Sequence, residues 1–186
     1  MNKILRPVLA LAFGSFLLAS CDKCEPTYTQ PTTEDLDWLV YDTKDSIRFV
    51  NESNKVFTYL RTNAYTQNIP GAGYSVSDDC IEKMDTQVVN VIQQVKNQQP
   101  GLAITILKTP EDLTVNLVVE DRGTYKIDKA NPTFATLDLN GFTYNNVFEV
   151  KADSTKATSL KRLLFNKEFG FLSLEMYDGR KLDLKR

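Results

Sequence analysis

The side chains available for catalysis are limited, because the chain of 186 residues contains no histidine. Without histidine the usual Ser-His-Asp and Cys-His nucleophilic systems cannot be built, and histidine-ligated zinc or copper sites are excluded as well. The stretch Gly71-Ala72-Gly73 follows Pro70 and is typical of a turn rather than of a phosphate-binding loop. The sequence therefore predicts no catalytic residue, no metal site and no cofactor, and it indicates a protein that is not an enzyme.

Paired carboxylates are the remaining candidates for chemistry. They occur at Asp78-Asp79, Glu111-Asp112 and Glu120-Asp121, each near the expected end of a strand. Two carboxylates that face one sugar, about 5 to 9.5 Å apart, could hydrolyse a glycosidic bond, and carboxylate oxygens could also bind Ca²⁺. Acidic pairs at turns are usually solvated, so a carboxylate-based hydrolase is kept only as an alternative function.

The first 20 residues have the composition of a secretory signal peptide. Lys3 and Arg6 precede an apolar run over 7–18, and small residues stand at the expected cleavage site. This run is too short for a membrane-spanning helix, which needs roughly 20 apolar residues. We therefore predict cleavage between Ser20 and Cys21 and export of the rest of the chain.

The residues around the cleavage site carry a resemblance. Leu18-Ala19-Ser20-Cys21 resembles the lipobox of bacterial lipoproteins, whose cysteine is acylated and becomes the mature N-terminus. The resemblance implies attachment of fatty acids such as palmitate at Cys21, and two or more acyl chains give stable membrane anchoring. The next residues, Asp22-Lys23-Cys24-Glu25, partly resemble the surface-export signal of Bacteroidota lipoproteins. Together these resemblances imply a place in the bacterial cell envelope, at the outer membrane, with surface exposure as one option.

If Cys21 carries lipid, Cys24 and Cys80 are the two cysteines that remain. Exported proteins enter an oxidising compartment, where such a pair can form a disulfide that ties the N-terminal segment to the domain. The alternative is a flexible segment in which Cys24 is free and Cys80 is a small buried residue. The sequence leaves both possibilities open.

The charge of the chain limits its partners. Without Lys3 and Arg6 the chain has 20 Lys and Arg residues against 24 Asp and Glu residues, a net charge of −4. This argues against nucleic acid as a partner, because phosphate binding needs a basic surface. Residues 151–186 nevertheless carry a net charge of +4. They could bind an acidic glycan or lipid headgroup, but solvated strand faces are the favoured interpretation.

The start of the mature chain differs in composition from the rest. Residues 21–33 are polar and contain two prolines, which predicts a lipidated tether before a domain over 34–186. A capped helical turn is expected over 33–36. It leads to Trp38 and Tyr41, which are expected to pack under a sheet.

Most of the domain alternates apolar and polar residues, as strands with one buried face do. The clearest case is 113–120, where Leu113, Val115, Leu117 and Val119 alternate with mostly polar residues. Other strands are predicted over 46–51, 56–62, 102–108, 133–139, 142–151, 160–166, 171–177 and 180–184. Asn140-Gly141 predicts a hairpin turn with positive φ at both residues. The prolines and glycines over 68–74 predict a loop.

The region 81–95 is ambiguous. Several of its apolar residues fall at helical spacing, yet the stretch from Val88 to Val95 is rich in β-branched side chains, which disfavour a helix. We predict a strand over 87–93 that pairs with 102–108.

Two further stretches carry a resemblance to small Bacteroidota outer-membrane lipoproteins. One is Tyr144-Asn145-Asn146-Val147 with the hairpin around Lys167-Glu168-Phe169-Gly170, and the other is Asp37-Trp38-Leu39-Val40-Tyr41. In that family a similar strand and hairpin close a β-rich C-terminal domain. The resemblance implies an architecture and brings no catalytic motif with it.

These observations predict an all-β domain, an antiparallel meander of roughly nine strands that forms a curved sheet, open barrel or sandwich. The predicted function is that of a lipid-anchored envelope lipoprotein, a non-enzymatic binding or structural module. Its expected partners are the membrane, through the lipid on Cys21, and either an envelope protein or an apolar ligand, and the sequence leaves its specific role and oligomeric state open. The alternative is a half-barrel that carries an apolar ligand or lipid, which is suggested by the 10 Phe and 8 Tyr residues.

Overall fold

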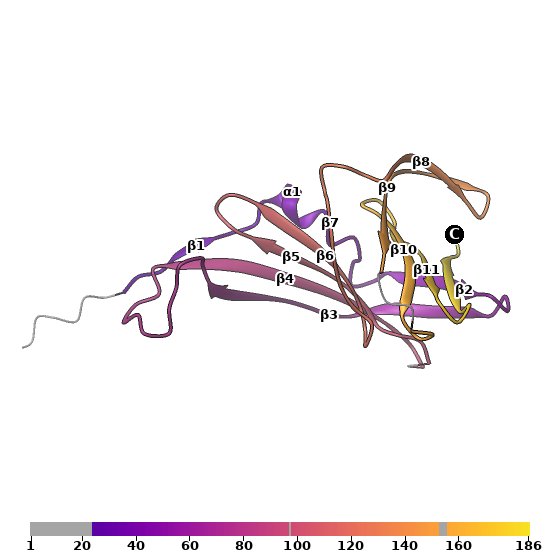
Figure 1. Ribbon diagram of the computed structural model, residues 1–186, viewed down its shortest axis with the longest axis horizontal. Coiled ribbons are helices and arrows are strands. Elements are labelled where there is room, and N and C mark those ends of the chain that lie inside the picture. The colour runs from indigo at the N-terminus through magenta and orange to yellow at the C-terminus, as the bar shows by residue number, and fades with distance from the viewer. Residues whose placement is uncertain (1–23, 97, 153–155) are drawn as a thin grey trace, which may run out of the picture.

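Figure 1 shows the computed structural model, which describes residues 24–96, 98–152 and 156–186. In this part of the chain nearly all regular structure is β, so the predicted all-β antiparallel class is confirmed, with 12 strands instead of roughly nine. A single four-residue helix, α1 (Thr33–Leu36), lies between the first two strands. The strands are β1 (Thr27–Thr29), β2 (Ser46–Asn51), β3 (Val56–Pro70), β4 (Lys83–Gln94), β5 (Leu102–Lys108), β6 (Leu113–Val119), β7 (Gly123–Ile127), β8 (Phe134–Leu139), β9 (Phe142–Lys151), β10 (Leu160–Asn166), β11 (Gly170–Met176) and β12 (Lys181–Leu184).

The sheet consists of two meanders that meet at its centre. Strands β2 to β7 pair with their neighbours in the chain, and so do β8 to β12, which gives the order β7-β6-β5-β4-β3-β2-β12-β11-β10-β9-β8. The two halves join where β2 pairs antiparallel with β12, with Phe49 opposite Leu184. Strand β1 is the exception, because it runs parallel to β4 with Thr27 opposite Lys83.

The ambiguous region 81–95 is strand β4. The predicted pairing with 102–108 is confirmed, with Ile92 opposite Leu102 and Thr86 opposite Lys108. The β-branched residues of this region pack well on a pleated surface, and that preference outweighs the helical spacing.

Two stretches differ from the predictions. The loop predicted over 68–74 is wrong for its first residues, because β3 continues until Pro70 lies opposite Met84 of β4. Proline donates no backbone hydrogen bond, which is tolerated at the end of an edge strand. Strand β7 was not predicted, since its five residues are too few to show a period. It follows a tight turn in which Asp121 and Gly123 have positive φ.

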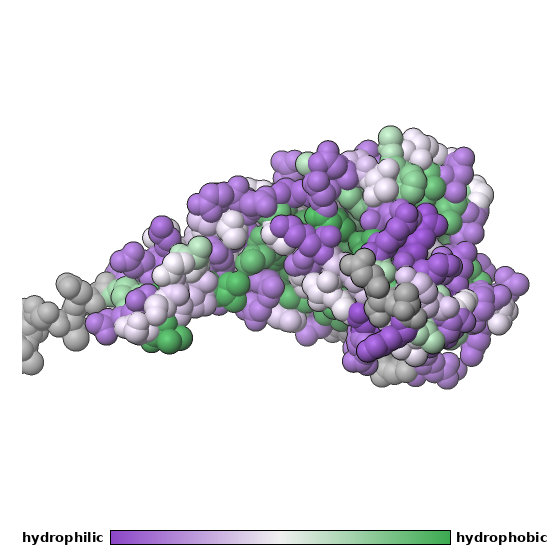
Figure 2. All heavy atoms as spheres, viewed as in Figure 1, coloured by the Kyte–Doolittle hydropathy of each residue, from purple (hydrophilic) through white to green (hydrophobic). Residues whose placement is uncertain are grey.

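The sheet curls into a half-barrel, so that β7 comes close to β9 (Figure 1). Its concave side holds one continuous core of buried apolar side chains. Figure 2 shows hydrophobic atoms visible between hydrophilic ones in the region where the strands of the two halves converge. The largest fully buried members of this core are Tyr59, Phe49, Phe165, Phe171, Ile92, Leu102, Ile104, Ile106, Leu117, Leu160 and Leu163.

The segment after α1 crosses the concave face and belongs to this core. Trp38 packs against Phe148 and Phe165, with ring centroids 5.6 and 6.5 Å apart. The Nδ2 of Asn90, which is buried in β4, donates hydrogen bonds to the backbone oxygens of Leu39 (3.2 Å) and Tyr41 (2.8 Å). The expected helical turn and the packing of Trp38 and Tyr41 under the sheet are thus confirmed.

The predicted hairpin turn between β8 and β9 is confirmed, since Asn140 and Gly141 have φ of 53° and 82°. Asn146, with φ of 52°, lies within β9 near the point where its pairing with β8, which ends at Val147, gives way to its pairing with β10, which begins at Phe148. The β8–β9 hairpin contributes to a second, smaller apolar cluster that includes Tyr144, Val147, Leu164 and Leu172.

Glu149 in β9 gives the fold a pH dependence. Its side chain is 8% exposed and lies 2.5 Å from Nε of Arg162 and 3.1 Å from Nζ of Lys151. Burial raises the pKa of this carboxyl, but the hydrogen bonds from Arg162 and Lys151 lower it more, so its pKa is below the ordinary value of 4.5. A carboxyl with a lowered pKa in the folded state stabilises the fold above its unfolded pKa and loses that contribution as the pH falls.

We therefore expect the free energy of unfolding to decrease as the pH drops below about 4.5, and Glu149→Gln to make this decrease shallower. Urea unfolding of both proteins between pH 6 and pH 3 measures the slopes. Parallel slopes for the two proteins would show that Glu149 does not contribute.

Candidate functional site

The β3–β4 hairpin reaches past the β5–β6 hairpin and ends at the same end of the molecule as β1 (Figure 1). We call residues 61–92 of this hairpin the arm. At about 3.3 Å per residue, the stretch of β3 from Arg61 to Pro70 is about 30 Å long. Residues 86–92 of the arm also pair with β5, so its tip, the loop 71–82, lies only a few residues beyond the body of the sheet.

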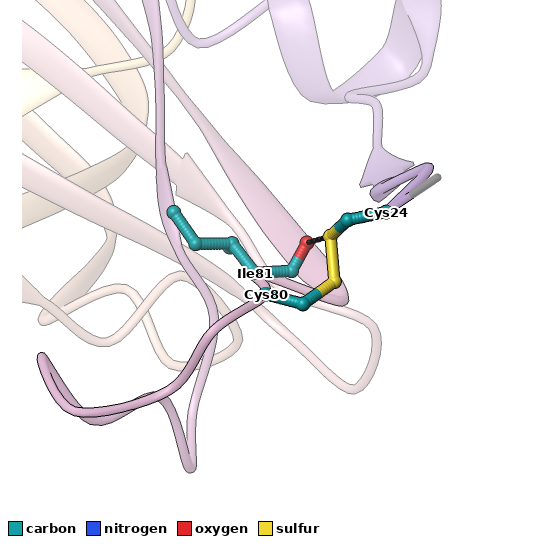
Figure 3. The surroundings of a disulfide bond; sticks show 3 residues. All are labelled: Cys24, Cys80 and Ile81. Carbon is teal, nitrogen blue, oxygen red and sulfur yellow. Dashed lines mark hydrogen bonds between the residues drawn. A yellow bond between two sulfur atoms is a disulfide. The ribbon is translucent and has the colours of Figure 1, made fainter. Parts of the chain in front are cut away.

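The N-terminal segment is tied to the tip of the arm by a disulfide between Cys24 and Cys80, whose Cα atoms are 5.7 Å apart (Figure 3). The Sγ of Cys24 also lies 3.5 Å from the backbone oxygen of Ile81. Three residues after Cys24, the N–H of Thr27 donates to the oxygen of Glu82 (2.8 Å), where β1 begins to pair with β4. Of the two possibilities left open by the sequence, the structure contains the disulfide.

The predicted attachment and cleavage residues, Cys21 and Ser20, lie outside the described residues. Cys21 precedes Cys24 by three positions, and three residues span at most about 11 Å. The point of attachment, the Cα of Cys21, therefore cannot be farther than that from the Cα of Cys24. The described part of the segment predicted as a tether, 24–33, includes this disulfide and β1.

The loop at the tip borders an open, mostly polar pocket of about 570 Å³, lined by Gly71–Tyr74 and Ser77–Lys83. Asp78 accepts a hydrogen bond from the N–H of Ser75 (2.7 Å), which shapes the loop. Val76 is 94% exposed. Figure 2 shows a small hydrophobic group of atoms at this end of an otherwise mostly hydrophilic arm.

The three acidic pairs do not meet in one cleft. Asp78-Asp79 lies in the loop 71–82, Glu111-Asp112 in the β5–β6 turn and Glu120-Asp121 in the β6–β7 turn. The last two turns are at opposite ends of β6, whose seven residues span roughly 20 Å. A glycosidase needs its two carboxylates within about 10 Å.

Members of these pairs also have structural partners. Asp112 forms an ion pair with Lys129 and its pKa is lowered, chiefly by the hydrogen bond from Lys129. Glu120 Oε2 accepts a hydrogen bond from the N–H of Gly101 (2.7 Å). Among the described residues no group of three or more Asp, Glu, His or Cys side chains could hold a metal ion.

A polar pocket of about 380 Å³ lies at the end of the sheet opposite the arm tip. Arg122 and Arg180 reach it from the β6–β7 and β11–β12 turns. Nη1 of Arg122 donates to the oxygen of Glu120 (3.1 Å), while its buried Nε has no hydrogen-bond partner. Arg180 is paired with Asp178 at 2.8 Å. Sequence reasoning missed this pocket because its residues come from turns that are distant in the chain.

The basic excess of residues 151–186 is largely neutralised within the fold. Six of its nine Lys and Arg residues form ion pairs with carboxylates, namely Lys151, Lys161, Arg162, Lys167, Arg180 and Lys181. Arg186 stacks on the rings of Phe142 and Phe169, with its Cζ 4.9 and 4.2 Å from their centroids. This favours solvated strand faces over a basic binding surface.

Comparison with known proteins adds no assignment, since no protein-family model, curated protein or solved structure matches this chain. In the described part of the chain, no helix has the length and apolar character needed to cross a membrane.

Proposed function

We propose that this protein is a lipid-anchored lipoprotein of the bacterial cell envelope, attached to the outer membrane through acyl groups on Cys21. Its β domain acts as a non-enzymatic binding or structural module. The proposal joins the lipobox resemblance of the first 21 residues with the position of the disulfide in the fold.

The disulfide between Cys24 and Cys80 is the observation that carries the proposal. Disulfides persist in the oxidising compartments outside the cytosol, which agrees with export. This bond also fastens the chain three residues after Cys21 to the tip of the arm. A lipid on Cys21 would thus be attached at an end of the molecule that the disulfide holds to the loop 71–82.

The same observations weigh against the two alternatives. A carrier of an apolar ligand needs room on the concave face, which is filled by the protein's own side chains, including Trp38 and Phe165. A carboxylate-based hydrolase needs two carboxylates that face one substrate. Glu111-Asp112 and Glu120-Asp121 lie at opposite ends of β6, and in the tip pocket Asp78 already accepts the loop hydrogen bond from Ser75. A binding or structural role requires neither feature.

Cell fractionation tests the anchor. We expect the unaltered chain in the membrane fraction, released by detergent, and Cys21→Ala in the soluble fraction, because the variant has no sulfur to acylate. Cys24→Ala is the matched control, since it removes a cysteine three positions away and should stay in the membrane fraction. Membrane retention of Cys21→Ala, or a soluble unaltered chain, would refute lipid attachment.

A further inference from the structure

Strand β3 has a long stretch of backbone that is paired on one side only. Its first five residues pair with β2, which begins at Ser46 opposite Leu60. Beyond that point β3 pairs with β4 alone, up to Pro70. Within the described residues, no other strand or backbone hydrogen bond reaches its outer side between residues 62 and 70. We call residues 62–70 the β3 edge. Figure 1 shows it along the outer border of the arm.

The β3 edge has none of the charged residues that usually protect such strands. Its sequence is Thr-Asn-Ala-Tyr-Thr-Gln-Asn-Ile-Pro, whereas 25% of the whole chain is charged. Residues 62–68 are all exposed, and the Tyr65 side chain is 45% exposed. Natural proteins block exposed edges with lysines, prolines, bulges or short strands, because an open edge is a template for another strand. In β3 the bulge after Arg61 lies at one end of the open stretch and Pro70 lies at the other, so neither blocks the residues between them.

The two outer edges of the same sheet are protected in the expected way. Strand β7 has five residues, includes Lys126 and lies near β9. Strand β8 has six residues and includes Asp138. The outer edge strands β7 and β8 are short and charged, whereas the β3 edge is long and neutral. This difference indicates that the β3 edge is a contact surface.

We propose that the β3 edge joins two copies of this chain by antiparallel pairing, so that one sheet continues through both arms. A strand that pairs with its own copy about a two-fold axis brings the residues near the axis close to their own copies, so a charge there would lie close to a like charge. The absence of charge over nine residues removes that penalty. The edge also offers no charge for a partner of opposite charge to recognise, which favours a second copy over a charged partner.

The geometry of the arm permits this contact. The edge begins where the pairing of β3 with β2 stops and continues to the tip of the arm, along the outer border of the sheet, so the body of one copy does not block the strand of the other (Figure 1). Antiparallel pairing places the tip of each arm beside the base of the other arm. The Cys24–Cys80 disulfides lie beyond the paired strands and remain outside the contact.

Cysteine cross-linking of the full chain in its native membrane tests the proposal. Single cysteines are placed at each position from Asn63 to Asn68, and cells are treated with a mild oxidant. In a two-fold antiparallel pair only the residue on the axis faces its own copy at about 4.5 to 5.5 Å, a separation that a disulfide can bridge. We expect covalent dimer of twice the monomer mass to peak at one position and to fall on both sides of it.

A variant with added charge tests whether the contact can be lost while the fold of each copy is kept. Asn63→Lys with Gln67→Lys places like charges along the paired edges, so the cross-link at the peak position should be lost while thermal unfolding of the chain stays unchanged. Thr105→Lys with Thr114→Lys is the matched control. Thr105 lies in the same cross-strand row as Tyr65, and Thr114 lies in the same row as Gln67. Both residues are in the interior of the sheet, on β5 and β6, away from the edge. The control should keep the cross-link.

Three results would overturn the proposal. One is the absence of covalent dimer at every position, and another is an equal yield at all positions or at Thr136→Cys on the β8 edge. The third is a cross-linked product whose mass requires a different protein, because the edge would then bind another partner.

Discussion

Gly170→Ala is expected to lower the free energy of unfolding by about 3 kcal/mol. Gly170 begins β11 with φ of 78°, a left-handed conformation that costs an alanine about 1 to 2 kcal/mol. A Cβ at this position would also overlap the phenol of Tyr41. The Tyr41 hydroxyl accepts a buried hydrogen bond from the N–H of Phe171 (2.7 Å), and displacing it leaves that donor unpaired at a cost of about 1 to 3 kcal/mol.

Gly141→Ala is the matched control for this prediction. Gly141 has a similar φ of 82°, but a Cβ there would meet no other residue within 4 Å. Its substitution should cost only the backbone strain, about 1 to 2 kcal/mol. Urea unfolding of the two variants measures the difference, and equal losses would show that the contact between Gly170 and Tyr41 does not matter.

Removing the disulfide, by Cys24→Ser together with Cys80→Ser, is expected to cost about 4 kcal/mol. The bond closes a loop with a sequence separation of 56 residues, which restricts the unfolded chain strongly in the chain-entropy model. That loop contains Trp38, Tyr41 and Phe49 of the core as well as the β3 strand of the arm. The variant should therefore unfold at lower urea concentration.

Reductant provides the control for the disulfide. Treating the unaltered protein with dithiothreitol should reproduce the loss seen in the double variant, and the same treatment should not change the double variant itself. A reductant effect of equal size on both proteins, or none on the unaltered protein, would contradict a stabilising role for the bond.

Local pattern was enough to predict much of the sheet. The alternation from Leu113 to Val119 defines β6, and Asn140-Gly141 gives the hairpin between β8 and β9 with the expected positive φ. These features depend on residues that are neighbours in the chain, where side-chain period and turn geometry are decisive.

Pairings between distant residues were not predictable in the same way. Nothing in β2 or β12 identifies the other as its partner, yet their contact joins the two halves of the sheet. The extension of β3 to Pro70 depends on the length of β4, which overrides the local turn signal of a proline followed by glycines. The arm and its open edge follow from the lengths of β3 and β4, so they could be recognised only in three dimensions.

The candidate site was predicted in part. The pair Cys24 and Cys80 followed from counting cysteines in an exported chain, and the disulfide is present. Its position at the tip of an arm depends on the β3–β4 pairing and could not be derived from spacing. The polar pocket with Arg122 and Arg180 was missed for the same reason.

The most direct test of lipid anchoring is the intact mass of the protein extracted from membranes. The account predicts the mass of residues 21–186 plus acyl groups, and the loss of those acyl groups in Cys21→Ala. A mass that matches the uncut chain, or residues 21–186 without any addition, would contradict it.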